Sequence, residues 1–399
     1  MKKSVAGLVI LALLSALFMV GCGENQGTAT SGRATKQVEI TDNGMTFGNN
    51  LTIGAFYYPW YGTNIHWRNG YLRGKLKPAQ KPYLGEYECS DPRVAEQHIK
   101  WAKEYGIDYF LISWWGPNGL EDYNLQNGYL KASNVSDVKF GILYETAGRL
   151  KNDFNFTAET EKKLTEDFDY LASKYFKLPN YLKYQGKPVV YFYLSRTFSG
   201  DYVNVISDVK KYIKQKYGMD LFIIGDEIYW GQFPGPEKFK ILDATSMYNF
   251  HNIAIAGRYA GKFDFFERVE GLYKFALQTS KDNKKYFIPD VLPGYNDLGV
   301  RPGARNAPIP REVNKGEEGQ ETLLSSLLEL AYKYVDPDLN TILVTSWNEW
   351  HEDTQIEPTA RRGKVTNEPQ DLTIKFSYAP YGFKDLEIIK AFKEKYAKK

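Results

Sequence analysis

The chain has 399 residues, of which 43% are hydrophobic and 25% are charged, as is ordinary for a globular protein with one large domain or two medium ones. Its net charge is only +3 and its Lys and Arg residues form no long block, which argues against a nucleic-acid-binding role. Aromatic residues make up 16% of the chain, and this excess fits both an aromatic-rich core and a groove that stacks on sugar rings.

The N-terminus resembles a bacterial lipoprotein signal. Two lysines near the start are followed by an apolar run over residues 5–20, which is shorter than the roughly 20 residues that a membrane-spanning helix needs. A glycine and Cys22 come directly after this run, and Met19 stands where a leucine is more usual. We therefore expect residues 1–21 to be a lipoprotein signal peptide. An ordinary secretory signal with an incidental cysteine is the alternative.

Lipidation of Cys22 would hold the chain to a membrane of the bacterial cell envelope through that anchor only. The chain has two cysteines, so Cys89 would remain a free thiol and the fold would depend on its core. Residues 23–36 are rich in Gly, Thr, Ser and Asn. This composition predicts a flexible tether, which we place at residues 22–44.

Beyond the tether, strand and helix signals alternate along the chain. Apolar, β-branched and aromatic runs predict strands at residues 52–58, 108–114, 139–144, 188–194, 221–225, 244–248, 286–292 and 341–345. Amphipathic segments predict helices at residues 93–105, 157–175, 202–217, 264–279, 318–335 and 383–396. Eight strands alternating with helices predict a single (β/α)8 TIM barrel over residues 45–399. An open doubly wound sheet is the alternative, but no glycine-rich dinucleotide motif follows the first strand.

The predicted strands end in aromatic and acidic side chains. In a (β/α)8 barrel these ends share one face, which carries the active site. Each tyrosine alone is as well explained by core packing, but the recurrence around one rim favours a binding site. The residues that we expect to contact a ligand there, apart from those after the last strand, are Tyr58, Trp60, Tyr61, Trp115, Glu145, Tyr193, Tyr248, Asn249 and Arg301.

The segment after the last predicted strand is the most informative. Glu349 and Glu352 lie three residues apart among Trp347, Trp350 and His351, and we expect Trp350 and His351 to contact the ligand as well. Apolar surroundings can keep one carboxyl group protonated while its neighbour is ionised, as sugar hydrolysis requires. A surface loop with solvated acids is the alternative. No HExxH spacing occurs and no second histidine lies near His351 along the sequence, so we expect no metal or other cofactor.

These segments resemble glycoside hydrolase family 99, the endo-α-1,2-mannosidases and endo-α-1,2-mannanases. The matching pieces are Phe56–Tyr61, Gly106–Asp108 with Ser113–Trp115, Tyr144–Glu145, Tyr184–Tyr193, Gly225–Glu227 and Trp347–Glu352. The resemblance implies a (β/α)8 fold, no metal, and hydrolysis that retains the anomeric configuration. It also implies that the substrate is α-mannan or another mannose-rich glycan. We further expect the protein to be a monomer.

The resemblance also implies a role for each acid. Glu349 would take the proton of the substrate's own 2-hydroxyl group, whose oxygen attacks the anomeric carbon and gives a 1,2-anhydro sugar. Glu352 would protonate the leaving oxygen and then activate water. In family members from bacteria a tryptophan at the position of Trp115 accompanies a preference for mannose over glucose beside the cleaved mannoside. The residues themselves leave open Glu349 as a covalent nucleophile, a non-catalytic glycan-binding lipoprotein, and an amidase or deacetylase.

Overall fold

The computed structural model describes residues 38–397 except for positions 49, 63–64, 151–153, 230–232, 249–264, 304–307, 313–321 and 361–362. The expected signal peptide and Cys22 lie outside the described residues, as does most of the expected tether. The compact unit that contains the barrel starts at Val38. Two residues before position 45 bond to this unit: Thr41 N donates to Ser136 Oγ at 2.7 Å, and Asn43 Nδ2 donates to the Asp137 carbonyl at 3.2 Å.

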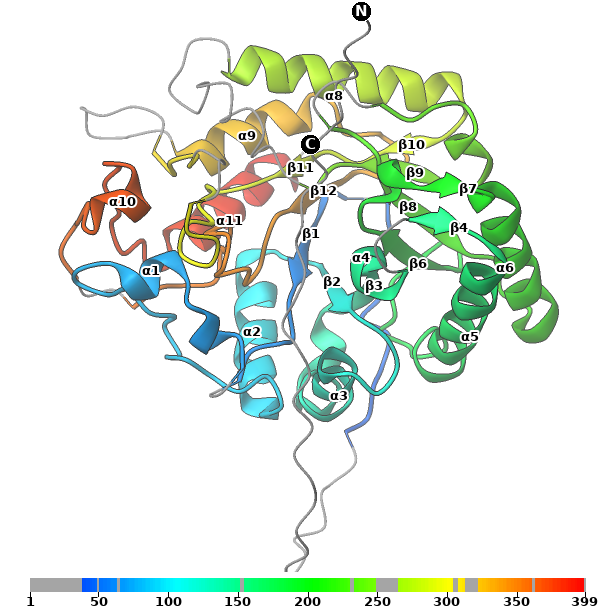
Figure 1. Ribbon diagram of the computed structural model, residues 1–399, viewed down its shortest axis with the longest axis horizontal. Coiled ribbons are helices and arrows are strands. Elements are labelled where there is room, and N and C mark those ends of the chain that lie inside the picture. Colours follow the sequence, from blue (N-terminus) through cyan, green and yellow to red (C-terminus); the bar gives the residue numbers. More distant parts are fainter. Residues whose placement is uncertain are drawn as a thin grey trace, which may run out of the picture. The chain divides into compact units, whose positions relative to one another are not determined.

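Parallel strands form the barrel that the sequence predicts (Figure 1). Their order in the sheet is β10-β9-β8-β6-β3-β2-β1-β12-β11. The strands are β1 (Thr52–Tyr57), β2 (Tyr109–Trp114), β3 (Lys139–Tyr144), β6 (Lys187–Phe192), β8 (Phe222–Asp226), β9 (Ala244–Ser246), β10 (Tyr286–Phe287), β11 (Asp290–Val291) and β12 (Thr341–Val344).

The seventh predicted strand is divided into two short strands, β10 and β11, which together close the sheet. β10 pairs with β9 and β11 pairs with β12, and Ile288 and Pro289 lie between them. Hydrogen bonds continue across the interruption, because Ile288 N donates to the Thr245 carbonyl and the Pro289 carbonyl accepts from Leu343 N, both at 2.9 Å. Proline has no N–H to donate, which explains why the ladder is interrupted there.

Side chains alternate between the inside of the barrel and the helix layer. All six residues of β1 are buried, as expected for a parallel strand covered on both faces. Ile53 and Ala55 pack in the cluster beneath the helices, whereas Phe56 belongs to the cluster inside the barrel with Tyr109 and Leu343. A Cβ on Gly54 would lie 2.1 Å from the Tyr109 ring, so this inward position accepts only glycine.

Helices surround the sheet (Figure 1). The longer ones are α2 (Pro92–Tyr105), α3 (Leu120–Asn127), α5 (Ala158–Lys174), α6 (Tyr202–Tyr217), α8 (Phe265–Asp282), α9 (Leu323–Tyr332) and α11 (Lys384–Ala397). Helix α2 begins as its sequence predicts, with Pro92 in the first turn and the Asp91 side chain accepting from Arg93 N. Gly106, with φ of 89°, ends it in the left-handed conformation and turns the chain into β2.

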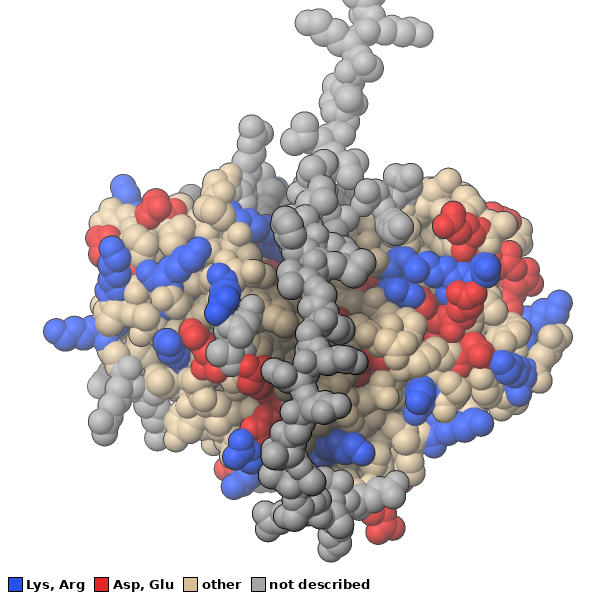
Figure 2. All heavy atoms as spheres, turned by 60° about the horizontal axis from the view of Figure 1, so that its bottom comes forward, with Lys and Arg blue, Asp and Glu red and all other residues tan. Residues whose placement is uncertain are grey.

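Shorter elements complete the fold. They are α1 (Leu72–Lys75), α4 (Thr146–Arg149), α10 (Gln370–Thr373), β4 (Asn155–Phe156), which pairs with β7 (Ser199–Gly200), and β5 (Lys183–Tyr184), which pairs antiparallel with β6. No helix in the described part of the chain is long and apolar enough to cross a membrane. Lys and Arg mix with Asp and Glu on the face drawn in Figure 2, in keeping with the low net charge.

Candidate active site

The loop that follows β12 carries both candidate acids and is held in one conformation by its own backbone. Ser346 N donates to the Thr354 carbonyl, and the Ser346 carbonyl accepts from Ile356 N, both at 2.8 Å. The Ser346 hydroxyl also accepts from Glu349 N at 2.8 Å. Because the two sides of the loop are joined next to the strand end, Glu349 and Glu352 are placed by the barrel rather than by a free loop.

Glu349 is 3% exposed and forms a pair with His351. Its Oε1 accepts from His351 N at 2.9 Å and lies 3.3 Å from His351 Nδ1. The other ring nitrogen, Nε2, donates to the His66 carbonyl at 3.0 Å. Burial lowers the pKa of His351, but the hydrogen bond and charge of Glu349 outweigh burial, so that the pKa is raised. The geometry therefore favours an imidazolium that donates from both nitrogens.

Glu352 has a different environment. Its Oε1 lies 3.1 Å from Arg301 Nη1, and its buried Oε2 has no hydrogen-bond partner among the described residues. Burial raises the pKa of Glu352 to about 7 and the charge of Glu349 adds to this rise, although Arg301 opposes it. Glu352 is thus suited to give up a proton near neutral pH, while Glu349 accepts hydrogen bonds from His351.

Aromatic rings from several strand ends lie around the two acids. Trp60, after β1, stacks on His66 with centroids 4.7 Å apart and lies 5.8 Å from His351. Burial lowers the pKa of His66 to about 4, so this ring is neutral beside the His351 imidazolium. The Tyr58 hydroxyl is hydrogen-bonded to that of Tyr248. These contacts hold the rings of Trp60, Tyr58 and Tyr248 at the end of the barrel that carries the two acids.

The two adjacent tryptophans after β2 face different sides of the sheet. Trp114 is fully buried in the helix layer, where its Nε1 donates to Asp122 Oδ1 at 2.8 Å. Trp115 is partly exposed and lies 6.3 Å from Trp60, across the rim. A Cβ on Gly148 would lie 2.1 Å from the Trp115 ring, so the indole packs directly on the backbone of α4. Of the two, Trp115 is therefore on the side of the acids.

Glu145, after β3, is a third carboxyl group of the site. Its Oε1 accepts from the Ser113 hydroxyl at 2.7 Å, and that hydroxyl accepts from Trp115 Nε1 at 3.0 Å. Burial raises the pKa of Glu145 to about 8, and the charges of Glu349 and Glu352 add to this effect. A neutral carboxyl group both donates and accepts, which suits the recognition of a sugar hydroxyl group. Tyr193, after β6, is partly exposed, with its ring 5.1 Å from Tyr248.

Several of the residues that we expected to contact a ligand are buried, among them Tyr58, Glu145, Tyr248 and His351, which are 4–7% exposed. The two that are buried most deeply are Trp350 and Tyr61. Trp350 is completely buried and its Nε1 donates to Glu357 Oε2 at 2.7 Å. Tyr61 is 1% exposed, stacks on Trp67 at 4.0 Å, and its hydroxyl accepts from Trp350 N at 3.0 Å. Both side chains help to hold the loop that follows β12 in place. Asn249 lies outside the described residues.

Residues that sequence reasoning did not single out hold the loop in place. Glu357 is fully buried and accepts from the Tyr87 hydroxyl at 2.9 Å as well as from Trp350. His98, on α2, joins Glu357 to the Tyr57 hydroxyl, with both ring nitrogens at 3.1 Å from their partners. The sequence does not reveal this network, because polar residues flank both positions: Gln97 precedes His98, and Gln355 lies two residues before Glu357.

No group of three or more His, Cys, Asp or Glu side chains within the described ranges could hold a metal ion. Cys89 is buried and forms no disulfide in the described part of the chain, and burial raises the pKa of its thiol.

Comparisons with known proteins point to one family. The model of the family described as glycosyl hydrolase family 99 matches residues 49–398. Glycoprotein endo-alpha-1,2-mannosidase of Rattus norvegicus is 25% identical over 397 residues, which covers 88% of this chain and 76% of the relative. The Mus musculus protein of the same name is 26% identical over 392 residues, with the same shares covered.

Solved structures show the same fold. The GH99 endo-alpha-mannosidase from Bacteroides thetaiotaomicron superposes with a TM-score of 0.63 at 20% identity, over 87% of this chain and 97% of that one. A protein described as glycoside hydrolase-like gives a TM-score of 0.65 at 20% identity, over 91% and 97% of the two chains.

Proposed function

This chain belongs to glycosyl hydrolase family 99 and is a glycoside hydrolase, and we propose that it cleaves internal α-1,2-mannosidic bonds of α-mannan or high-mannose glycans with retention of configuration. The observation that carries this proposal is the pair of acids after β12. Glu349 accepts hydrogen bonds from His351, and Glu352 has a pKa of about 7 beside Arg301. A glycan-binding protein without catalysis does not need two carboxyl groups in such different environments.

In the first step, Glu349 removes the proton of the 2-hydroxyl group of the mannose to be cleaved. The freed oxygen attacks the anomeric carbon as the bond from that carbon to the leaving oxygen breaks, and Glu352 gives its proton to the leaving oxygen. The product is a 1,2-anhydro sugar, and no bond to the protein forms. The axial 2-hydroxyl group of mannose suits this route because it lies trans to an α-linked leaving group.

In the second step, Glu352, now ionised, takes a proton from water while the water oxygen attacks the anomeric carbon. The bond from that carbon to the 2-oxygen breaks, and the 2-oxygen recovers a proton from Glu349. Each step inverts the anomeric carbon, so the configuration is retained overall. Arg301 lies close enough to stabilise the ionised Glu352 that exists between the two steps.

Removing either carboxyl charge tests these roles. Glu349→Gln and Glu352→Gln should each lower kcat by orders of magnitude while the Kd for a mannan tetrasaccharide changes little, because both groups act in the transition state. A substrate with a leaving group that needs no protonation should partly restore only Glu352→Gln. Full activity of either variant would remove that residue from its role. A glycan trapped covalently on Glu349 would favour a nucleophile over the anhydro-sugar route.

The N-terminal segment supports a further proposal about location. Cys22 would carry lipid and hold a monomeric enzyme to the bacterial cell envelope, where it meets a glycan from outside the cell.

A further inference from the structure

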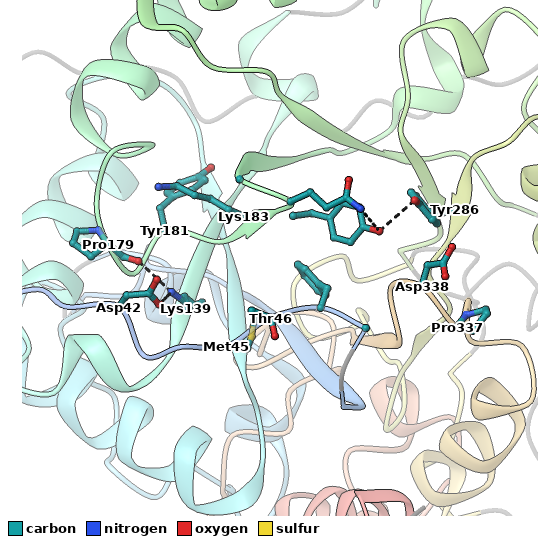
Figure 3. A pocket seen from close by; sticks show the side chains of 15 residues that line it. Asp42, Met45, Thr46, Lys139, Pro179, Tyr181, Lys183, Tyr286, Pro337 and Asp338 are labelled. Atoms are coloured by element: carbon teal, nitrogen blue, oxygen red, sulfur yellow. Dashed lines mark hydrogen bonds and ion pairs between the residues drawn. The ribbon is translucent and has the colours of Figure 1, made fainter.

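A cavity of about 830 Å³ lies far from the acids, among residues that stand at or before the first residues of the strands (Figure 3). Lys139 opens β3, Tyr286 opens β10, Lys183 belongs to the hairpin that leads into β6, and Asp338 precedes β12. Glu349 and Glu352 follow the end of β12. Because the strands of the barrel are parallel, the cavity and the acids lie at opposite ends. Its volume is in the range of roughly 300–1,000 Å³ that is typical of sites for small ligands.

Three aromatic rings form one wall of this cavity. Phe47 and Tyr184 lie 5.8 Å apart, and Tyr184 and Tyr286 lie 5.5 Å apart, all in edge contacts. Their polar ends are joined, because the Tyr184 hydroxyl donates to the Tyr286 hydroxyl at 3.2 Å and Gln185 Nε2 lies 3.4 Å from the Tyr184 hydroxyl. Phe47 and Tyr286 are only partly buried. Ring surfaces next to hydroxyl and amide groups match the alternating C–H and O–H surfaces of a sugar.

The charges around the cavity cancel. Its lining holds two lysines and two aspartates, which are Asp42, Lys139, Lys183 and Asp338. Lys139 is already occupied, because its ammonium group bonds Asp42 and the Pro179 carbonyl. Burial and the nearby Lys139 lower the pKa of Lys183, which weakens the site further for an anion. The lining is therefore suited to a neutral, polyhydroxylated ligand rather than to a phosphate or an acidic polymer.

We propose that this cavity is a second, non-catalytic binding site for a neutral stretch of mannose-rich polysaccharide. The inference rests on the proposed function, because it takes the polymer that the acids cleave as the ligand. A weak second contact keeps a long or particulate polymer near the enzyme between cleavages and raises its effective concentration at the acids. A short oligosaccharide cannot occupy both ends of the barrel at once, so the second site does not change the rate at which it is cleaved.

The test compares long and short substrates. In the double variant Lys183→Ala/Gln185→Ala, kcat/KM on α-mannan should fall by roughly three- to tenfold, while kcat/KM on a mannan tetrasaccharide stays unchanged. A matched double variant on the exposed face of α8, Lys274→Ala/Gln278→Ala, should behave as the wild type on both substrates. If kcat/KM of the cavity variant falls on both substrates, the fold is damaged, and this result counts against the proposal. The proposal also fails if the cavity variant and the wild type cleave α-mannan with equal kcat/KM.

Binding is measured separately from cleavage, so that a failure of the proposed function can be distinguished from a failure of the proposed second site. Native gel electrophoresis through α-mannan uses the Glu352→Gln variant, which should bind glycans without cleaving them, and tetrasaccharide is added to fill its active site. The mannan should retard this protein and should no longer retard it once Lys183→Ala/Gln185→Ala is added. Equal retardation of both proteins, or retardation by dextran sulfate but not by mannan, would overturn the second site. If the wild type cleaves neither substrate, the proposed function fails, and the gel experiment still decides whether the cavity binds a glycan.

Discussion

Replacing Arg301 by methionine should move the alkaline limb of the pH profile of kcat/KM upward by about one pH unit. The limb reports the loss of the proton from the catalytic acid, which we assign to Glu352. Arg301 Nη1 lies 3.1 Å from Glu352 Oε1, and its positive charge stabilises the ionised carboxylate. Without that charge the pKa of Glu352 rises above its value of about 7, so the acid keeps its proton to higher pH.

The size of the shift follows from Coulomb's law. Two unit charges 3.1 Å apart interact by about 1.3 kcal/mol in water-like surroundings and by ~5 kcal/mol at an effective dielectric constant of 20. The Arg301 side chain is 47% exposed, so solvent screens the pair and the smaller value applies. Since one pKa unit corresponds to about 1.4 kcal/mol, the limb should move from about 7 to about 8.

The assay is kcat/KM for release of reducing ends from a mannan tetrasaccharide between pH 5 and 10, fitted with one acidic and one alkaline limb. Arg301→Lys is the matched control, because it keeps the positive charge and should leave the alkaline limb near its wild-type position. A lower maximum in Arg301→Met without a shift of the limb would refute the reasoning, since Arg301 would then act only on binding. A limb that moves to lower pH would refute the assignment of Glu352 as the acid.

Three further outcomes are expected. Trp115→Tyr should lower the preference for Man-α-1,3-Man over Glc-α-1,3-Man donors by roughly 1–3 kcal/mol in relative kcat/KM, and an unchanged ratio would remove Trp115 from the recognition of this sugar. Glu357→Gln should lower the free energy of unfolding in urea by about 1–3 kcal/mol, because glutamine has one acceptor oxygen where the carboxylate has one for Trp350 and Tyr87 and another for His98, whereas the exposed Glu104→Gln should change it by less than about 0.5 kcal/mol. Cys22→Ala should release the protein from the membrane fraction, and unchanged fractionation would rule out the lipid anchor.

Strand positions were predictable because parallel strands that are buried on both faces consist of continuous apolar runs. Each predicted strand matches an observed one within about two residues, apart from the seventh. Pro289 could have indicated the division of that strand, because a proline within a predicted strand marks an interruption. The placement of the acids was predictable for a related reason: once β12 is assigned, the residues after it must lie at the active face of the barrel.

The direction of individual aromatic side chains was not predictable. Neighbouring strand residues face opposite sides, so Trp114 and Trp115 exchange roles if the assignment of the strand end moves by one residue. The burial of Trp350 depends on Glu357 and on Tyr61, and Tyr61 lies on a loop that is distant in sequence. The local sequence does not reveal that the indole N–H of Trp350, and not that of Trp347, donates to a buried carboxylate.

The difference between the two acids is also set by residues that are distant in sequence. Read along the chain, Glu349 and Glu352 are two equivalent carboxylates three residues apart. In the structure, Glu349 faces His351, whose second nitrogen is fixed by the His66 carbonyl of the loop after β1, whereas Glu352 faces Arg301 of the loop after β11. These loops lie together because β12 pairs with β1 on one side and with β11 on the other. The division of acid and base work is therefore a property of these three neighbouring strands rather than of the motif that contains both acids.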